Sequence, residues 1–259
     1  MKLSPVNVVV LVLAVVSLFV PTPAHAETKI GFRQLTIVEP VAVQRGVSRQ
    51  VTLRSNFTLD GTHTVFFDQP GVTMTFAEKD SKDAPRKGRG SDGTPFTFDV
   101  VVSADAEPGI RELRVATDQA VSSVSHLMVT DYPVIHEDEK KVNNARDQAV
   151  AVTLPVAICG RVERAEDVDY YSFEGKAGQE ITAELFAQRA TAGIHGMVVR
   201  GPLIYLMDGL MTLYGPNGQV VAQNDNFSGG DSFIAATLPE DGGYSLEIRD
   251  ARYAGSGRY

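Results

Sequence analysis

The sequence predicts an all-β protein made of two antiparallel β-sandwich domains. Apolar and polar residues alternate with period two along much of residues 32–131, which is the pattern of half-buried antiparallel strands. The alternation stops at a charged segment and resumes near Ala149. A length of 259 residues is enough for two ordinary domains, each with its own core.

Residues 1–26 have the features of an export signal. Lys2 supplies a positive charge, Val8 to Val20 is almost entirely apolar, and Ala24-His25-Ala26 is a small-residue cleavage site. The apolar run is shorter than the roughly 20 residues that a membrane-spanning helix needs, so a cleaved signal is favoured over an uncleaved anchor. We therefore predict an exported protein with no transmembrane segment after cleavage.

Residues 27–131 are predicted to form an immunoglobulin-like sandwich. The clearest alternation runs through Phe96, Phe98, Val100 and Val102, with polar residues between them. Further strands are expected near residues 35–38, 50–54, 65–67, 72–76, 113–117 and 124–129. About seven strands at short spacing are typical of a β-sandwich.

Residues 132–148 are predicted to be a charged linker, because the run from His136 to Lys141 breaks the strand pattern. A short helix within residues 139–148 has no support from capping or apolar periodicity. A second sandwich is predicted over residues 149–259. Its inward rows are expected at Tyr171 with Phe173, at residues 181–185, and at residues 244–248, with a tight hairpin turn at Pro216-Asn217-Gly218.

Five short motifs follow one another in the second half of the chain. They are Asp167-Val-Asp-Tyr-Tyr-Ser-Phe173, Ala177-Gly-Gln179, Leu213-Tyr-Gly-Pro-Asn-Gly218, Asn224-Asp225 and Leu238-Pro-Glu-Asp-Gly-Gly-Tyr-Ser-Leu246. In this order they resemble the bacterial pre-peptidase C-terminal domain, a secreted β-sandwich module usually attached to proteases and other exported proteins without being catalytic itself.

The resemblance implies a jelly-roll-like second domain that lacks its last strand, because the chain stops after Ala254-Gly-Ser-Gly-Arg-Tyr259. The segments Val41 to Gly46, Phe67 to Gly71 and Ala104 to Gly109 resemble, more loosely, the domain that often precedes this module in large secreted bacterial proteins.

No catalytic residues are predicted. The glycine motif Gly88 to Gly93 lacks the preceding strand and following helix of a dinucleotide site. Gly230-Asp231-Ser232 is similar to the nucleophile block of one esterase family, but the last histidine in the chain is His195, so no base follows Ser232. The single cysteine, Cys159, is interpreted as a buried structural thiol.

Two loops are rich in the oxygen-bearing side chains that calcium prefers. The candidate ligands are Asp167, Asp169, Asn224, Asp225 and Asp231. The alternative is ordinary turn chemistry, since Asp and Asn side chains often bond to nearby backbone. A net charge of −8 without a basic stripe argues against nucleic acid as a partner.

Together these observations predict a secreted, non-catalytic protein that binds, spaces or anchors, with a location outside the cell, in the periplasm or at the cell surface. Its ligand is expected to be a protein or an envelope or extracellular polymer. The alternative is a non-catalytic fragment of a secreted protease or other exported hydrolase whose catalytic domain is encoded elsewhere. The apolar segment Gly193 to Leu210 could contact a partner or form a buried hairpin.

Overall fold

The computed structural model describes residues 34–55, 57–77, 94–138, 141–162, 164–190 and 207–255. The predicted signal at 1–26, the motif at 88–93, His195 and most of the apolar segment at 193–210 lie outside these ranges. Nearly all regular structure is β, so the predicted fold class is confirmed. Within the described ranges, no helix has the length and apolar character needed to cross a bilayer.

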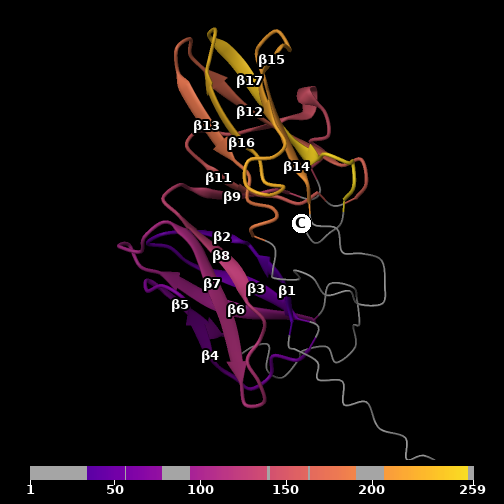
Figure 1. Cartoon of the computed structure of the whole chain (residues 1–259). Coiled ribbons are helices and arrows are strands. Elements are labelled where there is room, and N and C mark those ends of the chain that lie inside the picture. Colours follow the sequence, from indigo (N-terminus) through magenta and orange to yellow (C-terminus); the bar gives the residue numbers. More distant parts are fainter. Residues whose placement is uncertain are drawn as a thin grey trace, which may run out of the picture. The chain divides into compact units, whose positions relative to one another are not determined.

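The first sandwich consists of two four-stranded sheets, drawn from indigo to magenta in Figure 1. One sheet has the order β1-β3-β6-β5 and the other β2-β8-β7-β4. The strands are β1 (Leu35–Glu39), β2 (Ala42–Gln44), β3 (Ser48–Ser55), β4 (Thr62–Phe67), β5 (Val72–Phe76), β6 (Thr94–Val102), β7 (Gly109–Thr117) and β8 (Ser125–Thr130).

The core of the first sandwich lies between its two sheets. Phe96, Phe98 and Val100 of β6 are buried, as the alternation predicts, and they pack in one cluster with Leu113 and Leu127 of the other sheet. Seven of these eight strands were predicted from the sequence, and β2 was not. The immunoglobulin-like identity of this domain stays a prediction.

The segment predicted as a linker makes specific contacts with the second sandwich. Strand β9 (Val134–His136) pairs in parallel with β11 (Ala157–Cys159), and η2 (Arg146–Gln148) is a single 3₁₀ turn. Asn143 is buried, and its carbonyl accepts a hydrogen bond from the Tyr170 amide. These residues therefore contribute to the sandwich that follows them, while the division of the chain into domains stays a prediction.

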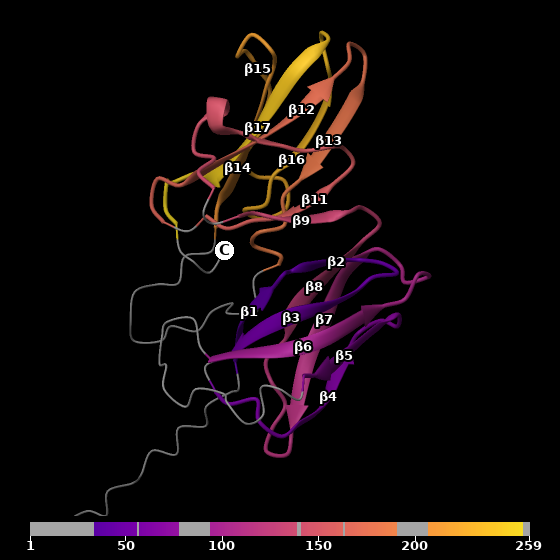
Figure 2. The same ribbon diagram turned by 180° about the vertical axis from the view of Figure 1, so that it is seen from behind.

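The second sandwich has a five-stranded sheet in the order β10-β12-β17-β14-β15, covered by the pair β13-β16. Figure 2 shows β12, β17 and β14 as neighbours from behind. The strands are β10 (Val150–Ala151), β12 (Val168–Gly175), β13 (Glu180–Glu184), β14 (Gly209–Tyr214), β15 (Val220–Asn224), β16 (Phe233–Thr237) and β17 (Gly242–Asp250).

The predicted inward rows and hairpin of this sandwich are confirmed. Phe173 and Tyr244 are buried in the same cluster, with ring centroids 5.7 Å apart. The turn at Pro216-Asn217-Gly218 joins β14 to β15, and Gly218 has the positive φ of +82° that this turn requires. The expected absence of a last strand stays a prediction. In the structure, β17 occupies the centre of the sheet.

Candidate functional site

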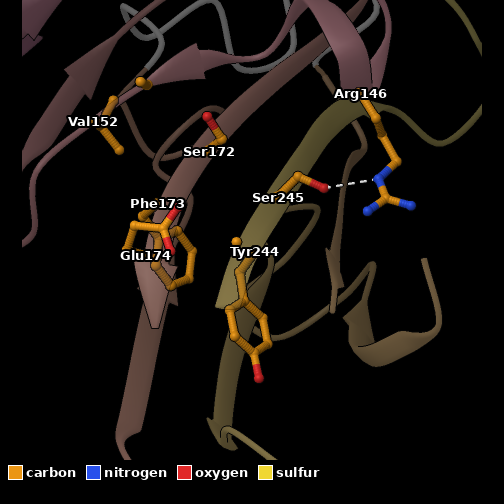
Figure 3. Close-up of a pocket in the computed structure, with 9 residues that line it drawn as sticks. Arg146, Val152, Ser172, Phe173, Glu174, Tyr244 and Ser245 are labelled. Atoms are coloured by element: carbon orange, nitrogen blue, oxygen red, sulfur yellow. Dashed lines mark hydrogen bonds between the residues drawn. The ribbon is translucent and has the colours of Figure 1, made fainter. Parts of the chain in front are cut away.

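A pocket of about 250 Å³ lies on the outer face of the five-stranded sheet, over β12 and β17 (Figure 3). Side chains alternate between the two faces of a strand, so the face that carries Ser172 and Glu174 is opposite the core side occupied by Phe173. The pocket is lined by Arg146, Ala151, Val152, Ser172, Phe173, Glu174, Gly243, Tyr244 and Ser245.

Arg146 reaches the pocket from the 3₁₀ turn in the predicted linker. Its Nε donates to the hydroxyl of Ser245 at 3.0 Å, and Nη2 donates to the carbonyl of Gly215 at 3.1 Å. The guanidinium carbon lies 5.2 Å from the centre of the Tyr214 ring, within the range of a cation–π contact. These interactions fix the position of the guanidinium at one side of the pocket.

The floor of the pocket is formed by two cross-strand pairs, Ser172 with Ser245 and Glu174 with Gly243. The Glu174 side chain is exposed. Among the described residues, no hydrogen bond or ion pair engages the Glu174 carboxylate or the Ser172 hydroxyl. Neither serine has a histidine beside it among the residues that line the pocket. The arrangement therefore offers hydrogen-bonding groups, and among the described residues no hydrogen bond joins the Glu174 carboxylate to either serine hydroxyl.

Next to the pocket, Glu247 of β17 is only 6% exposed and has three donors. Its Oε2 accepts from the hydroxyls of Tyr170 and Tyr214, and its Oε1 accepts from Arg249 Nε at 3.1 Å. Burial, and then the nearby carboxylate of Glu247, raises the pKa of both tyrosines. Both hydroxyls therefore stay protonated donors that stabilise the carboxylate.

Asp231, one of the predicted calcium ligands, is fully buried and has a complete set of donors. Its carboxylate accepts from the amides of Ala187, Gln188 and Arg189, and from Arg189 Nε at 2.7 Å. These bonds hold the turn that follows β13. Because its oxygens already have cationic and amide partners, Asp231 performs the turn-forming role that the sequence offered as the alternative.

Asn224 is the last residue of β15 and Asp225 follows it, and among the described residues neither side chain is bonded to the other predicted ligands. Asn224 Oδ1 accepts from the Phe233 amide at 3.1 Å, which is again a turn contact. The Asp225 side chain is exposed. The fully buried Ser232 donates its hydroxyl to the Gly209 carbonyl, so it too has a structural partner.

Asp167 and Asp169 lie at the start of β12 in a buried polar cluster that the sequence did not reveal as a whole. Glu137, which follows β9, is close enough to Asp169 to form a hydrogen bond with it. Glu137 Oε1 also accepts from Asn143 Nδ2 at 2.8 Å, and Asn144 Nδ2 donates to Asp167 Oδ1 at 3.1 Å. Glu137, Asn143 and Asn144 all belong to the segment predicted as a linker.

The electrostatics of this cluster are unfavourable for a fully ionised state. Asp169 is 5% exposed, and burial followed by the neighbouring Glu137 carboxylate raises the pKa of its carboxyl group. Within the described ranges, no three Asp, Glu, His or Cys side chains are already arranged to hold a metal ion. Calcium therefore stays a prediction.

Cys159 at the end of β11 is a free thiol, half-buried, and burial is the main cause of its raised pKa. A thiol of this kind is a poor nucleophile at neutral pH, because only the thiolate reacts.

The comparison with known families assigns the second sandwich. The family described as "Bacterial pre-peptidase C-terminal domain" matches residues 167–250, so this part of the chain is such a domain. A curated protein of Deinococcus radiodurans, "Probable subtilase-type serine protease", is 36% identical over 85 residues. That alignment covers 33% of this chain, and the chain spans only 10% of the length of that relative.

Three solved structures are similar at low levels. SGBP-B from the mixed-linkage glucan utilisation locus of Bacteroides ovatus, with a heptasaccharide, has 13% identity and a TM-score of 0.26 over 83% of this chain and 38% of that one. Domains 5–6 of the S-layer protein SbsC have 12% identity and a TM-score of 0.25 over 83% and 96%. The Yersinia pseudotuberculosis adhesin InvE has 12% identity and a TM-score of 0.20 over 85% and 51%. At these TM-scores the similarities carry no argument about this protein.

Proposed function

We propose that this chain, which carries a pre-peptidase C-terminal domain at residues 167–250, is a non-catalytic binding, spacing or anchoring part of an exported protein. The observation that carries the proposal is the extent of the match to the D. radiodurans protein. The shared part is confined to 85 residues, one tenth of that protein, and it corresponds to a single β-module here. A module of this size is about one small domain, which suits an accessory role.

The chemistry of the second sandwich supports a binding role. Ser232, the serine that the sequence singles out as a candidate nucleophile, is fully buried and donates to a main-chain carbonyl. Among the residues that line the pocket, the two serines Ser172 and Ser245 have no histidine beside them, and no hydrogen bond joins either hydroxyl to the Glu174 carboxylate. The pocket presents a carboxylate, hydroxyls and the side chain of Ala151, which can form hydrogen bonds and a small apolar contact with a ligand.

A second candidate function is favoured by the same relative. The chain could act as the accessory part of a secreted protease or other exported hydrolase, with the catalytic domain encoded elsewhere. The discriminating observation is a catalytic motif in the same or a neighbouring reading frame. If co-expression of such a catalytic protein with this chain leaves its activity and location unchanged, the stand-alone binding role is favoured.

We also propose that calcium binds at the polar cluster around Asp169. Carboxylate oxygens of Glu137, Asp167 and Asp169 and amide oxygens of nearby asparagines are of the kind that calcium prefers, but in the described structure they are not already arranged around an ion, so binding requires these side chains to reorient. The crowding of buried carboxylates supports this fit, because a bound cation would compensate a charge that otherwise requires a shared proton. When bound, calcium would supply this compensation and join the segment after β9 to the start of β12.

Sedimentation tests the binding role. The full chain is incubated with washed cell-envelope fragments and with insoluble extracellular polysaccharides, then centrifuged, with an unrelated acidic β-protein as control. We expect selective retention on at least one of these polymers. A chain that stays in the supernatant with every polymer, as the control does, would contradict binding and anchoring. Immunoblots of culture medium, periplasm and cytoplasm test export, which is expected to place the chain outside the cytoplasm.

A further inference from the structure

The pocket over β12 and β17 contains polar side chains that form no hydrogen bond or ion pair with the rest of the described structure. The Glu174 carboxylate and the Ser172 hydroxyl have no partner among the described residues. The Ser245 hydroxyl accepts from Arg146 Nε, which leaves its own proton available to donate. Hydrogen-bond acceptors and donors therefore lie close together beside the side chain of Ala151, while the side chain of Val152 packs against the core on the other face of the sheet. Figure 3 shows Val152 and Arg146 on opposite sides of the two serines.

The main-chain groups at this edge of the sheet argue against an added peptide strand. A peptide that extends a sheet needs a row of free amides and carbonyls. On this side of β12, the Ser172 carbonyl already accepts from the Val152 amide, and the Tyr170 amide already donates to the Asn143 carbonyl. These two main-chain groups of β12 are therefore not available to a ligand, which leaves the side chains of the pocket as its main contacts on this strand.

The guanidinium of Arg146 argues against a carboxylate or phosphate ligand. Recognition of such an anion typically uses two parallel N–H groups of one arginine. Here Nε and Nη2 are committed to Ser245 and to the Gly215 carbonyl. In addition, the free carboxylate of Glu174 would repel an anion at close range.

We propose that this pocket binds one sugar residue of an extracellular polysaccharide, an inference that rests on the binding role proposed above. A sugar hydroxyl both donates and accepts, so neighbouring hydroxyls can donate to Glu174 while they bond to Ser172 and Ser245. The sugar ring contacts the side chain of Ala151 at the side of the pocket. The volume of about 250 Å³ is below the roughly 300–1,000 Å³ of pockets for drug-sized ligands, which suits a single ring of a longer polymer.

Gly243 allows the pocket to be filled without altering the fold. A Cβ at this position would lie 3.6 Å from Glu174 Oε1, an ordinary van der Waals separation. Gly243→Ala therefore adds a methyl group to the pocket floor within a regular strand, where alanine is at least as favourable as glycine. Glu174→Ala removes the free carboxylate. The matched control is Glu180→Ala, which removes an exposed carboxylate from β13 in the other layer of the sandwich.

The test is an NMR titration of the full chain with four hexasaccharides: cellohexaose, laminarihexaose, maltohexaose and chitohexaose. We expect at least one to bind and to shift the amide signals of Ser172, Gly243 and Ser245. Glu174→Ala should weaken binding about tenfold, the equivalent of one hydrogen bond to a charged group. Gly243→Ala should weaken it by a similar factor, and Glu180→Ala should leave it unchanged. Melting temperatures of all three variants should match that of the parent protein.

Three results would overturn the inference: no binding of any of the four sugars, binding that is unaffected by both pocket variants, or binding of a lysine-rich peptide at this pocket in place of sugar. Failure of the inference differs from failure of the proposed function. If no sugar binds, only this inference fails and the proposed non-catalytic role stands. If the chain hydrolyses a substrate, the proposed non-catalytic role fails, whether or not a sugar binds.

Discussion

Asp231 and Asp169 are both buried aspartates of the second sandwich, but their surroundings are opposite. Asp231 has four hydrogen-bond donors, one of them the cationic Nε of Arg189. Asp169 lies beside the carboxylate of Glu137, and Asp167 is a further source of negative charge. Burial alone therefore does not tell whether an aspartate is already compensated. The partners decide, and they come from segments far away in the sequence.

Because their partners differ, Asp231 and Asp169 have different roles, although the sequence analysis placed both in one set of calcium ligands. A buried carboxylate with charged and amide donors stabilises its loop in the ionised form. A buried carboxylate next to another has a raised pKa and requires a proton or a cation. Of the five predicted calcium ligands, Asp167 and Asp169 therefore stay candidates with Glu137, while Asp231 serves as a structural anchor.

The largest expected effect comes from removing the anchor. Asp231→Ala leaves three amides and the Arg189 guanidinium without their shared acceptor, so the free energy of unfolding should fall by about 3–5 kcal/mol. Urea denaturation followed by circular dichroism measures this change. A loss below about 1 kcal/mol would show that Asp231 does not anchor the turn after β13.

Calcium should have the next largest effect. Suppose that the ion binds only the native state, at the Asp169 cluster. A free calcium concentration of 100 times the dissociation constant should then raise the free energy of unfolding by about 2.7 kcal/mol relative to the value in chelator. Melting curves of the parent protein and of Asp169→Asn measure this difference. The stabilisation should be lost in Asp169→Asn and retained in Asp225→Asn. Identical curves with calcium and chelator would leave all these residues as turn formers.

In the presence of chelator, Asp169→Asn should raise the free energy of unfolding, whereas most core substitutions lower it. The amide removes the buried charge of Asp169 beside the half-buried Glu137 carboxylate and can still donate a hydrogen bond to Glu137. We expect a gain of about 1 kcal/mol at pH 8 from urea denaturation, because repulsion and the need for a shared proton are both removed. A clear loss of stability would mean that the Asp169 carboxylate is compensated as fully as Asp231.

The smallest effect is expected at Asp225, which is exposed. Asp225→Asn should change the free energy of unfolding by no more than about 0.5 kcal/mol, the usual range for surface substitutions. The same urea experiment measures it. An effect as large as that of Asp231→Ala would show that the exposed loop, and not the buried anchor, holds this end of the sandwich.

Local patterns explain which parts of the fold could be predicted. The rows on β6 and β12 follow directly from period-two alternation, and the β14–β15 turn follows from Pro216-Asn217-Gly218. Strands β2, β9 and β11 have only three residues each, too few to show alternation. Their pairing depends on partners far along the chain, such as Val134 with Ala157, and no local signal reports such a contact.

The candidate sites were less predictable for the same reason. Asp231 and its partners are 42–44 residues apart, and the sequence shows only that its loop is polar and rich in glycine. Glu137 and Arg146 both lie in the segment predicted as a charged linker, yet Glu137 joins the acidic cluster and Arg146 borders the pocket. A run of charged residues in the sequence indicates only that the segment is polar. The role of each charged side chain depends on which strand it contacts in the fold.

The central claim is that this chain acts by binding and not by turnover. The most direct test incubates the purified full chain with casein, gelatin and p-nitrophenyl acetate, in calcium and in chelator, beside a heat-unfolded control. We expect no turnover above the control in either condition, for the parent protein and for Ser232→Ala and Ser172→Ala alike. Turnover by the parent protein that disappears in either serine variant would contradict it.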